Sequence, residues 1–135
     1  MNDCIFCKLI NRETPANIVY EDDEKMAFLE LNQSAPGHVM VILKRHGKTM
    51  WDYDEKEISS LMVGVQKVAK KVKNGMKADW LTIGINHEEK RGVPHLHVHI
   101  VPRWNDDGGG IIQTIVQNPV AEDRKKIAEK ISNAN

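Results

Sequence analysis

The stretch His95-Leu96-His97-Val98-His99-Ile100-Val101 carries a histidine at every second position, alternating with apolar residues. Successive side chains of a β-strand point to opposite faces of its sheet. The spacing therefore predicts a strand with three imidazoles on one face and an apolar face turned toward the core. Imidazoles titrate near neutral pH, so we expect the histidine face to be either a catalytic surface or a metal site.

Length and composition predict one domain over residues 1–135. The chain contains no linker, internal repeat or low-complexity tract. Its 19 basic and 19 acidic residues balance, which argues against a nucleic-acid partner. A group of lysines looks like a nucleic-acid patch but is interpreted as a solvated helix face: Lys67, Lys70, Lys71, Lys73 and Lys77.

The expected location is the cytoplasm, with no membrane partner. No stretch reaches the apolar length of a membrane span, and the first residues, Met-Asn-Asp-Cys, lack the pattern of a signal peptide. The two cysteines of the chain, Cys4 and Cys7, are spaced C-x-x-C. In a reducing compartment this spacing indicates a metal site or redox chemistry more than a structural disulfide.

Hydrophobic patterning predicts an α+β fold, a mostly antiparallel sheet of about five strands packed on one long helix. Strands are expected at 18–21, 26–31, 38–43, 80–85 and 95–101, the last stopping at Pro102. The long helix is expected to begin after Asp54, with Glu57 as its capping-box partner, and to end near Asn74-Gly75. Its predicted inward face comprises Ile58, Leu61, Met62, Val65, Val68, Ala69 and Val72.

Short helices are expected at both ends of the chain. The first covers 4–11 and turns Ile5, Phe6, Leu9 and Ile10 inward. The second begins at Asn118-Pro119 and places Val120, Ile127 and Ile131 on one face. The glycine-rich segment 107–110 between them and the sheet is expected to be flexible.

Three interpretations compete for the histidines. An H-x-H pair on a strand can hold a catalytic zinc ion. Alternatively, Cys4, Cys7, His46 and one histidine of the strand can complete a structural Cys₂His₂ zinc site. The third interpretation, histidines that only satisfy hydrogen bonds at a sheet edge, is disfavoured by strict alternation. For the cysteines, two small buried side chains on a helix face remain an alternative.

Together these segments resemble the histidine triad (HIT) superfamily, in its Hint-like branch with a C-x-x-C zinc site. The family signature His-φ-His-φ-His-φ-φ, where φ is apolar, is matched by 95–101. The resemblance extends to 4–10, 27–30 and 35–42, and to Asn86 before the active-site loop. The matches run from residue 4 to about residue 103, and the last thirty residues are less distinct.

The resemblance implies nucleotide hydrolysis or nucleotidyl transfer at an α-phosphate. By position, His97 is the nucleophile and forms a covalent nucleotidyl-histidine, while its other nitrogen donates to the carbonyl of His95. His99 assists the leaving group, and His38 lies beside the same site. The implied substrates are nucleoside phosphoramidates or dinucleoside polyphosphates.

The resemblance also assigns a zinc site and a purine-nucleotide site, with AMP as a possible product. A structural zinc ion is held by Cys4, Cys7, His46 and His95, which leaves His97 free to attack. The apolar slot for the base, the ribose position (Glu30) and the phosphate region comprise Ile5, Phe6, Leu9, Phe28, Glu30, Asn86, Gly92, Val93 and His99. A homodimer is implied through the long helix and an edge strand, with Met62, Val65 and Val72 as candidate contacts.

Two positions depart from the family pattern. Glu30 is one methylene longer than the usual Asp or Asn. The loop 90–94 has Gly92 where relatives carry a hydroxyl that contacts phosphate. Arg91 can replace that hydroxyl, because guanidinium suits phosphate, or it can be a solvated charge. This departure keeps a second function open, a nucleotide- or partner-binding module with little turnover.

Overall fold

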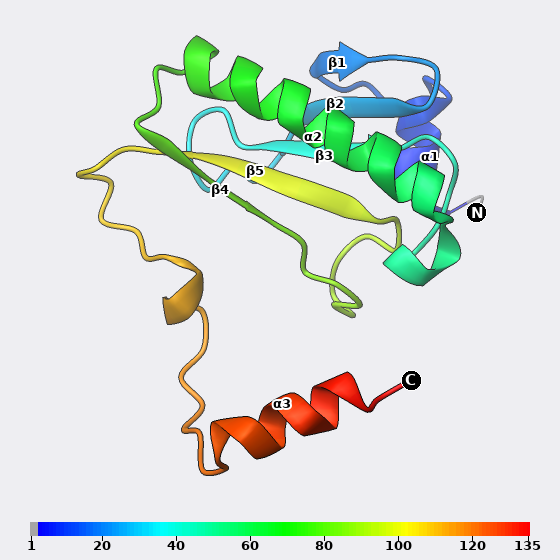
Figure 1. Cartoon of the computed structure of the whole chain (residues 1–135). Helices are drawn as coiled ribbons and strands as arrows, with labels where there is room; N and C mark the ends of the chain where they lie inside the picture. Colours follow the sequence, from blue (N-terminus) through cyan, green and yellow to red (C-terminus); the bar gives the residue numbers. More distant parts are fainter. Residues whose placement is uncertain (1–2) are drawn as a thin grey trace.

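The computed structural model describes residues 3–135 and contains a five-stranded antiparallel sheet within them (Figure 1). Its strands lie in the order β1-β2-β3-β5-β4. They are β1 (Ile18–Glu21), β2 (Lys25–Leu29), β3 (Val39–Leu43), β4 (Trp80–Gly84) and β5 (His97–Arg103). Each neighbouring pair is antiparallel, so the predicted fold class is confirmed.

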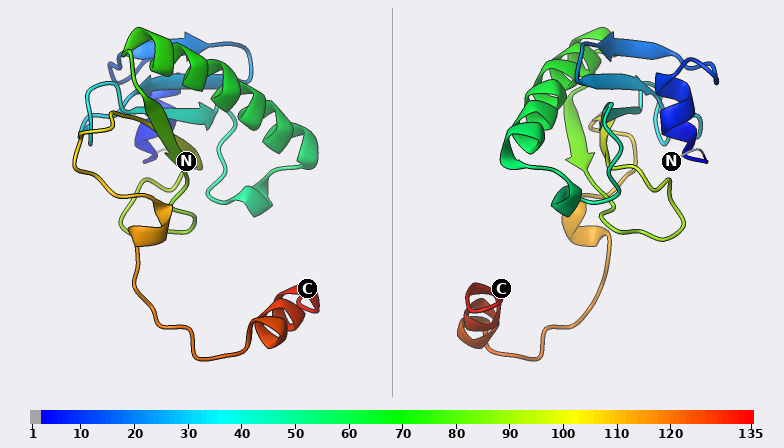
Figure 2. Two further views of the ribbon diagram at one scale, coloured as in Figure 1. Left: turned by 60° about the vertical axis from the view of Figure 1, so that its left-hand side comes forward. Right: turned by 90° about the vertical axis from the view of Figure 1, so that its right-hand side faces the viewer.

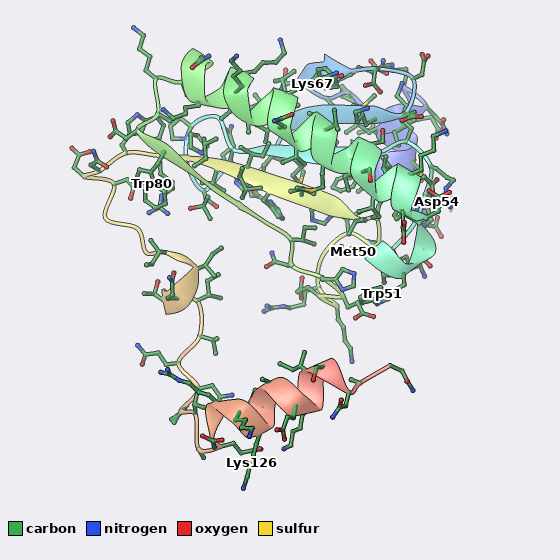
Figure 3. The ribbon with its side chains drawn as sticks, in the orientation of Figure 1. Met50, Trp51, Asp54, Lys67, Trp80 and Lys126 are labelled. Carbon is green, nitrogen blue, oxygen red and sulfur yellow. The ribbon has the colours of Figure 1, made fainter. Side chains whose placement is uncertain are left out.

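The long helix α2 (Glu55–Gly75) covers one face of the sheet, and the short helix α1 (Ile5–Ile10) covers the other (Figure 2). At the start of α2, Asp54 accepts from the Glu57 amide and Glu57 accepts from the Asp54 amide, which confirms the predicted capping box. The predicted lysines of α2 are exposed; Lys67 points away from the sheet in Figure 3.

Alternation along the strands divides the core into two layers. Val41, Val98 and Ile100 face α2, whereas Met26, Phe28 and Met40 face α1. Because α1 is short, it covers only part of its face of the sheet. The remaining part carries the histidines of β5.

The boundaries of the histidine strand differ from the prediction. β5 begins at His97, because the Leu96 amide donates to the carbonyl of Gly47 instead of a strand neighbour. It continues through Pro102 to Arg103, since its pairing with β3 spans only His97 to Ile100. Pro102 therefore has a strand partner on one side only, where a missing N–H is tolerated.

Several predicted inward residues lie elsewhere. Met62 is 49% exposed, on a flank of α2 rather than beneath it, and Ile5 is 43% exposed. Val65 and Val72 are buried in the core of one chain, so they are not available as dimer contacts. Of the three candidate dimer residues, only Met62 is on the surface.

The C-terminal helix begins later than predicted. Helix α3 (Arg124–Ser132) begins after Asp123 instead of Pro119, and Val120 and Ile131 are exposed. Short 3₁₀ turns lie at Met50–Asp52 and Ile112–Thr114. Asp107 is held by a bidentate ion pair with Arg103, so residue 107 does not belong to a flexible segment. Within residues 3–135 no helix is both long and apolar enough to span a bilayer.

Candidate active site and metal centre

A cavity of about 1040 Å³ opens beside β5, between α1 and the loop 86–94. Its volume suits a small-molecule ligand. All nine residues predicted to contact the nucleotide line it: Ile5, Phe6, Leu9, Phe28, Glu30, Asn86, Gly92, Val93 and His99. His97 lines it as well. The exposure of Ile5, which contradicts a core position, is explained by its place on the cavity wall.

The apolar part of the cavity lies directly against the histidines. Phe6 and Phe28 pack edge to face with ring centroids 5.2 Å apart. The Phe6 ring also lies 5.3 Å from the His97 ring, edge to face. A flat apolar group held here therefore has a reactive imidazole at its side.

The tautomer of His97 is set by the backbone. Its Nδ1 lies 2.7 Å from the carbonyl oxygen of His95, which can only accept a hydrogen bond. Nδ1 therefore carries the proton. The lone pair is left on Nε2, the nitrogen that a nucleophilic imidazole needs free.

Hydrogen bonds also fix the tautomers of His38 and His99. The Ser34 amide donates to Nδ1 of His38 at 3.1 Å, so the proton of His38 is on Nε2. That nitrogen lies 2.8 Å from Nδ1 of His99 and donates to it. The neutral His99 ring therefore carries its own proton on Nε2.

Burial keeps both of these imidazoles neutral. It lowers the pKa of His38, and it lowers the pKa of His99 to about 4, with neighbouring His97 and His38 adding to the shift. The Glu30 carboxylate opposes the shift in both rings. Glu30 lies with His38 and His99 in one group whose ligand atoms are within 4.8 Å of one another. The facing nitrogens of the two rings are already used by their mutual hydrogen bond.

The structure also brings the four predicted metal ligands together from three segments of the chain. Their donor atoms, on Cys4, Cys7, His46 and His95, lie within 4.8 Å of one another. Sγ–Nδ1 distances are 3.6 Å for Cys4–His95, 3.3 Å for Cys7–His46 and 3.7 Å for Cys7–His95. Zn–S and Zn–N bonds of about 2.3 and 2.0 Å at a tetrahedral angle separate S from N by about 3.5 Å. The donor set fits zinc.

His95 has the tautomer that such a site requires. Its Nε2 donates to the carbonyl of Leu43 at 2.7 Å, so the lone pair is on Nδ1, facing the thiols. Burial lowers the pKa of His95 to about 4, which keeps the ring neutral. Burial also raises the pKa of the Cys7 thiol. Without a bound cation the Cys7 thiolate is therefore disfavoured.

The loop 86–94 lines the cavity at every residue except Arg91. Arg91 is directed to Glu89, its Nε donating at 3.0 Å, and its side chain is 93% exposed. Nε2 of His87 accepts from the Met50 amide, and its ring packs on Trp51; Figure 3 shows Met50 and Trp51 beside this loop. His87 is therefore held in place by these two contacts, and it is only partly exposed.

Several residues that line the cavity were not predicted from the sequence, and two of them, Lys48 and Thr49, are polar groups that a phosphate could contact. Lys48 and Thr49 follow the metal-ligand candidate His46 by two and three positions. They bring an ammonium group and a hydroxyl to a cavity whose other loop lacks a hydroxyl at Gly92. The signal available was their position directly after a strand that neighbours the histidine strand.

The chain is similar to known proteins in both sequence and fold. The HIT domain family matches residues 11–106. An uncharacterized HIT-like protein of Borreliella burgdorferi is 38% identical over 140 residues, covering 98% of both chains. The crystal structure of a Streptococcus mutans protein superposes with a TM-score of 0.86 at 36% identity, over 98% of this chain and 85% of that one.

Two further matches bear on chemistry. The adenosine 5′-monophosphoramidase of Saccharomyces cerevisiae is 32% identical over 114 residues, covering 81% of this chain and 68% of that protein. The crystal structure of a zinc-bound histidine triad family protein from Mycobacterium smegmatis superposes with a TM-score of 0.75 at 27% identity. It covers 98% of this chain and 99% of that one.

Proposed function

This chain belongs to the HIT domain family, and from that premise we propose that it hydrolyses or transfers nucleotides at the α-phosphorus through a covalent nucleotidyl-His97. The observation that carries the proposal is the hydrogen bond from Nδ1 of His97 to the carbonyl of His95, which leaves Nε2 unprotonated beside the cavity. A relative named as an adenosine 5′-monophosphoramidase supports the substrate class.

In the first step, the Nε2 lone pair of His97 attacks the α-phosphorus, a P–N bond forms and the bond to the leaving group breaks. His99 presents its Nε2 proton to the departing atom and stabilises the charge that develops there. In the second step water attacks phosphorus and the P–N bond to His97 breaks. The leaving group takes up one proton from solvent as it departs in the first step. The attacking water releases one proton to solvent in the second step, so protons balance over the two steps.

His38 acts on this reaction through His99. By accepting from the Ser34 amide, it presents Nε2–H to His99 and so directs the His99 proton into the cavity. His38 is therefore proposed as a positioning residue, which refines its predicted catalytic role. The base is proposed to lie on the wall formed by Ile5, Phe6, Leu9 and Phe28, the ribose at Glu30, and the phosphates near Asn86, Gly92 and Val93.

We propose that Cys4, Cys7, His46 and His95 hold a structural zinc ion. When bound, it would join α1 to the segment before β5 and so fix the cavity wall relative to His97. Four protein ligands leave no open position for water, so the proposed reaction proceeds without metal chemistry. We further propose a cytoplasmic protein in which residues 1–135 form one domain and two copies pair.

The test is nucleotide release, followed by liquid chromatography, from an adenosine phosphoramidate and from diadenosine tetraphosphate. Turnover of either substrate that depends on His97 supports the proposal, and preference for one identifies the leaving group. If neither substrate turns over, and both wild type and His97→Ala bind AMP equally, the chain is a binding module. The observation that favours this second function is that Arg91, which pairs with Glu89, does not itself line the cavity.

A further inference from the structure

The cavity extends beyond the residues that a single nucleotide needs. Its volume of about 1040 Å³ lies at the upper end of the range of about 300–1,000 Å³ for small-molecule sites. A nucleotide with its base on α1 and β2 and its α-phosphate at His97 leaves one end of this volume uncovered. That end, here named the leaving-group end, is lined by Lys48, Thr49, His87, Glu88, Glu89 and Lys90.

The charge of the leaving-group end favours an anion. Within residues 3–135 neither Lys48 nor Lys90 forms an ion pair. The Glu89 carboxylate is neutralised by Arg91, whose amide and Nε donate to it at 2.7 and 3.0 Å. Glu88, with a side chain 60% exposed, adds one negative charge. The two lysines therefore outweigh the remaining carboxylate, and a ligand at this end should be negatively charged.

The backbone of Lys48 is fixed beside the cavity. Oδ2 of Asp52 accepts from the amides of Lys48 and Thr49, both at 2.8 Å. Asp52 and Thr49 also form the capping box of the 3₁₀ turn Met50–Asp52, which follows directly. These bonds use the carboxylate of Asp52 on the backbone, so the Lys48 ammonium stays available to a ligand.

Trp51 lies at the rim of the same end. Its side chain is 77% exposed, although a single exposed apolar side chain is ordinary on a protein surface. What distinguishes Trp51 is its place: its ring packs edge to face on His87, with ring centroids 5.3 Å apart, and His87 lines the cavity. The Met50 amide donates to Nε2 of His87 at 2.9 Å and holds turn and loop together, as Figure 3 shows.

An ammonium group and an indole ring match the two parts of a nucleotide. A lysine binds phosphate as a point charge. Every base has a π-face that can stack on an aromatic side chain. Beyond the scissile bond of a dinucleoside polyphosphate come first phosphates and then a base, the order in which Lys48 and Trp51 follow the cavity outward. The amine of a simple phosphoramidate offers neither part.

We propose that Lys48 and Trp51 form a second nucleotide subsite, in which Lys48 binds the phosphates of the leaving nucleotide and Trp51 stacks on its base. The proposal rests on the proposed reaction at the α-phosphorus and selects dinucleoside polyphosphates as its substrates. With diadenosine tetraphosphate, the P–O bond between the α-phosphorus and the bridging oxygen breaks as the P–N bond to His97 forms. ATP leaves from the second subsite, water then releases AMP from His97, and one water is consumed in all.

The test is equilibrium binding, measured in the His97→Ala background so that no ligand is turned over. AMP, ATP and diadenosine tetraphosphate are titrated by calorimetry in magnesium-free buffer. Diadenosine tetraphosphate should bind at least about tenfold more tightly than AMP, because only it reaches both residues. Lys48→Met should raise the dissociation constants of ATP and diadenosine tetraphosphate at least about fivefold, whereas Trp51→Leu should do so for diadenosine tetraphosphate alone.

Two controls and a spectroscopic signal make the test specific. Lys67→Met removes an exposed lysine of α2 that does not line the cavity, so every dissociation constant should change by less than about twofold. Trp51→Phe keeps a ring for stacking and should retain most of the affinity. Diadenosine tetraphosphate, but not AMP, should quench tryptophan fluorescence, and Trp51→Leu should abolish the quenching.

The outcomes separate this inference from the proposed function. Diadenosine tetraphosphate that binds no more tightly than AMP would overturn the second subsite. A dissociation constant for this ligand that is unchanged by Lys48→Met or by Trp51→Leu would overturn it as well. In both cases the proposed function would stand on AMP binding and on turnover that depends on His97, which are measured separately. Failure of AMP itself to bind would overturn both.

Discussion

His95 and His97 lie two residues apart, yet their rings present opposite nitrogens to their surroundings. His95 donates from Nε2 to the Leu43 carbonyl and turns Nδ1 to the thiols of Cys4 and Cys7. His97 donates from Nδ1 to the His95 carbonyl and turns Nε2 to the cavity. One ring is completely buried and the other is partly exposed.

The contrast shows how one short segment can serve a metal centre and a reacting centre together. Each ring has a single carbonyl acceptor, and that acceptor decides which nitrogen keeps a lone pair. The metal-centre residues, Cys4, Cys7, His46 and His95, should then govern stability. The residues of the reacting centre, His97, His99 and His38, should govern turnover.

We expect the largest effect from His97→Ala, which should lower turnover without affecting the metal centre. Removing the nucleophile should lower kcat by about 10⁴-fold or more, because unrelated enzymes that form covalent intermediates lose at least that much with their nucleophile. The melting temperature and AMP affinity should stay close to wild type. Steady-state kinetics check the loss of kcat, and thermal unfolding checks that the melting temperature is unchanged. A kcat loss below tenfold would contradict the assigned role.

Cys4→Ser should lower stability while turnover by the folded protein persists. Loss of one ligand should remove the metal and lower the free energy of unfolding by about 3 kcal/mol, because metal affinity is coupled to folding. Turnover per folded molecule should persist at low temperature. Metal content by mass spectrometry, thermal unfolding and kinetics after stringent chelation provide the check. Activity that chelation abolishes in folded protein, and that added zinc restores, would instead identify a catalytic metal.

His38→Ala should have a smaller effect, about 10- to 100-fold in kcat, because it removes the group that orients His99. Its distinctive signature is in titration. Burial holds the pKa of His99 at about 4, against 6.5 for a free imidazole, so wild-type His99 stays neutral as pH falls from 7 to 5. Opening the site to water should raise this pKa toward 6.5. NMR titration of the His99 ring checks the shift, and an unchanged pKa would leave His38 without a positioning role.

The same depressed pKa predicts how acid affects the fold. Between pH 6.5 and about 4 the unfolded chain binds a proton at His99 that the folded chain does not bind. The contribution of neutral His99 to stability is therefore present above pH 6.5 and is lost as pH falls toward 4. Urea unfolding at pH 7 and pH 5 should show lower stability at pH 5. His99→Asn, which has no titrating group, should show a smaller difference between the two values.

The smallest effect is expected from Arg91→Ala, less than about threefold in kcat/KM, because an exposed ion pair contributes little. Lys48→Ala is the matched comparison, since Lys48 lines the cavity and Arg91 does not. We expect Lys48→Ala to raise KM several-fold. If Arg91→Ala has the larger effect, the loop 90–94 must turn inward when nucleotide binds.

The sequence predicted which side chains would meet. Alternation placed His97 and His99 on one face of a strand, and the capping box at Asp54 placed the long helix. The family resemblance brought together cavity residues from α1, β2 and the loop 86–94, and metal ligands from three separate segments. These predictions depend on side-chain identity, which the sequence records directly.

The family resemblance implied that His97 donates to the His95 carbonyl. The tautomer of His95 could not be predicted, because it depends on the backbone carbonyl of Leu43, and every residue has a carbonyl. The strand start at His97 depends likewise on the Gly47 carbonyl, which takes the Leu96 amide. Helical periodicity near the C-terminus correctly indicated a helix that contains Ile127 and Ile131. Periodicity does not say whether a surface on the same chain covers that helix.

Trapping the nucleotide on the protein tests the central claim most directly. The chain is mixed with an adenosine phosphoramidate, quenched within a single turnover and digested, and the modified residue is located by mass spectrometry. Phosphorus–nitrogen coupling in ¹⁵N-histidine protein then identifies the bonded nitrogen. We predict the nucleotidyl group on Nε2 of His97, in wild type and in Cys4→Ser alike. Product formation with no modified protein, or modification of His99, would contradict the account.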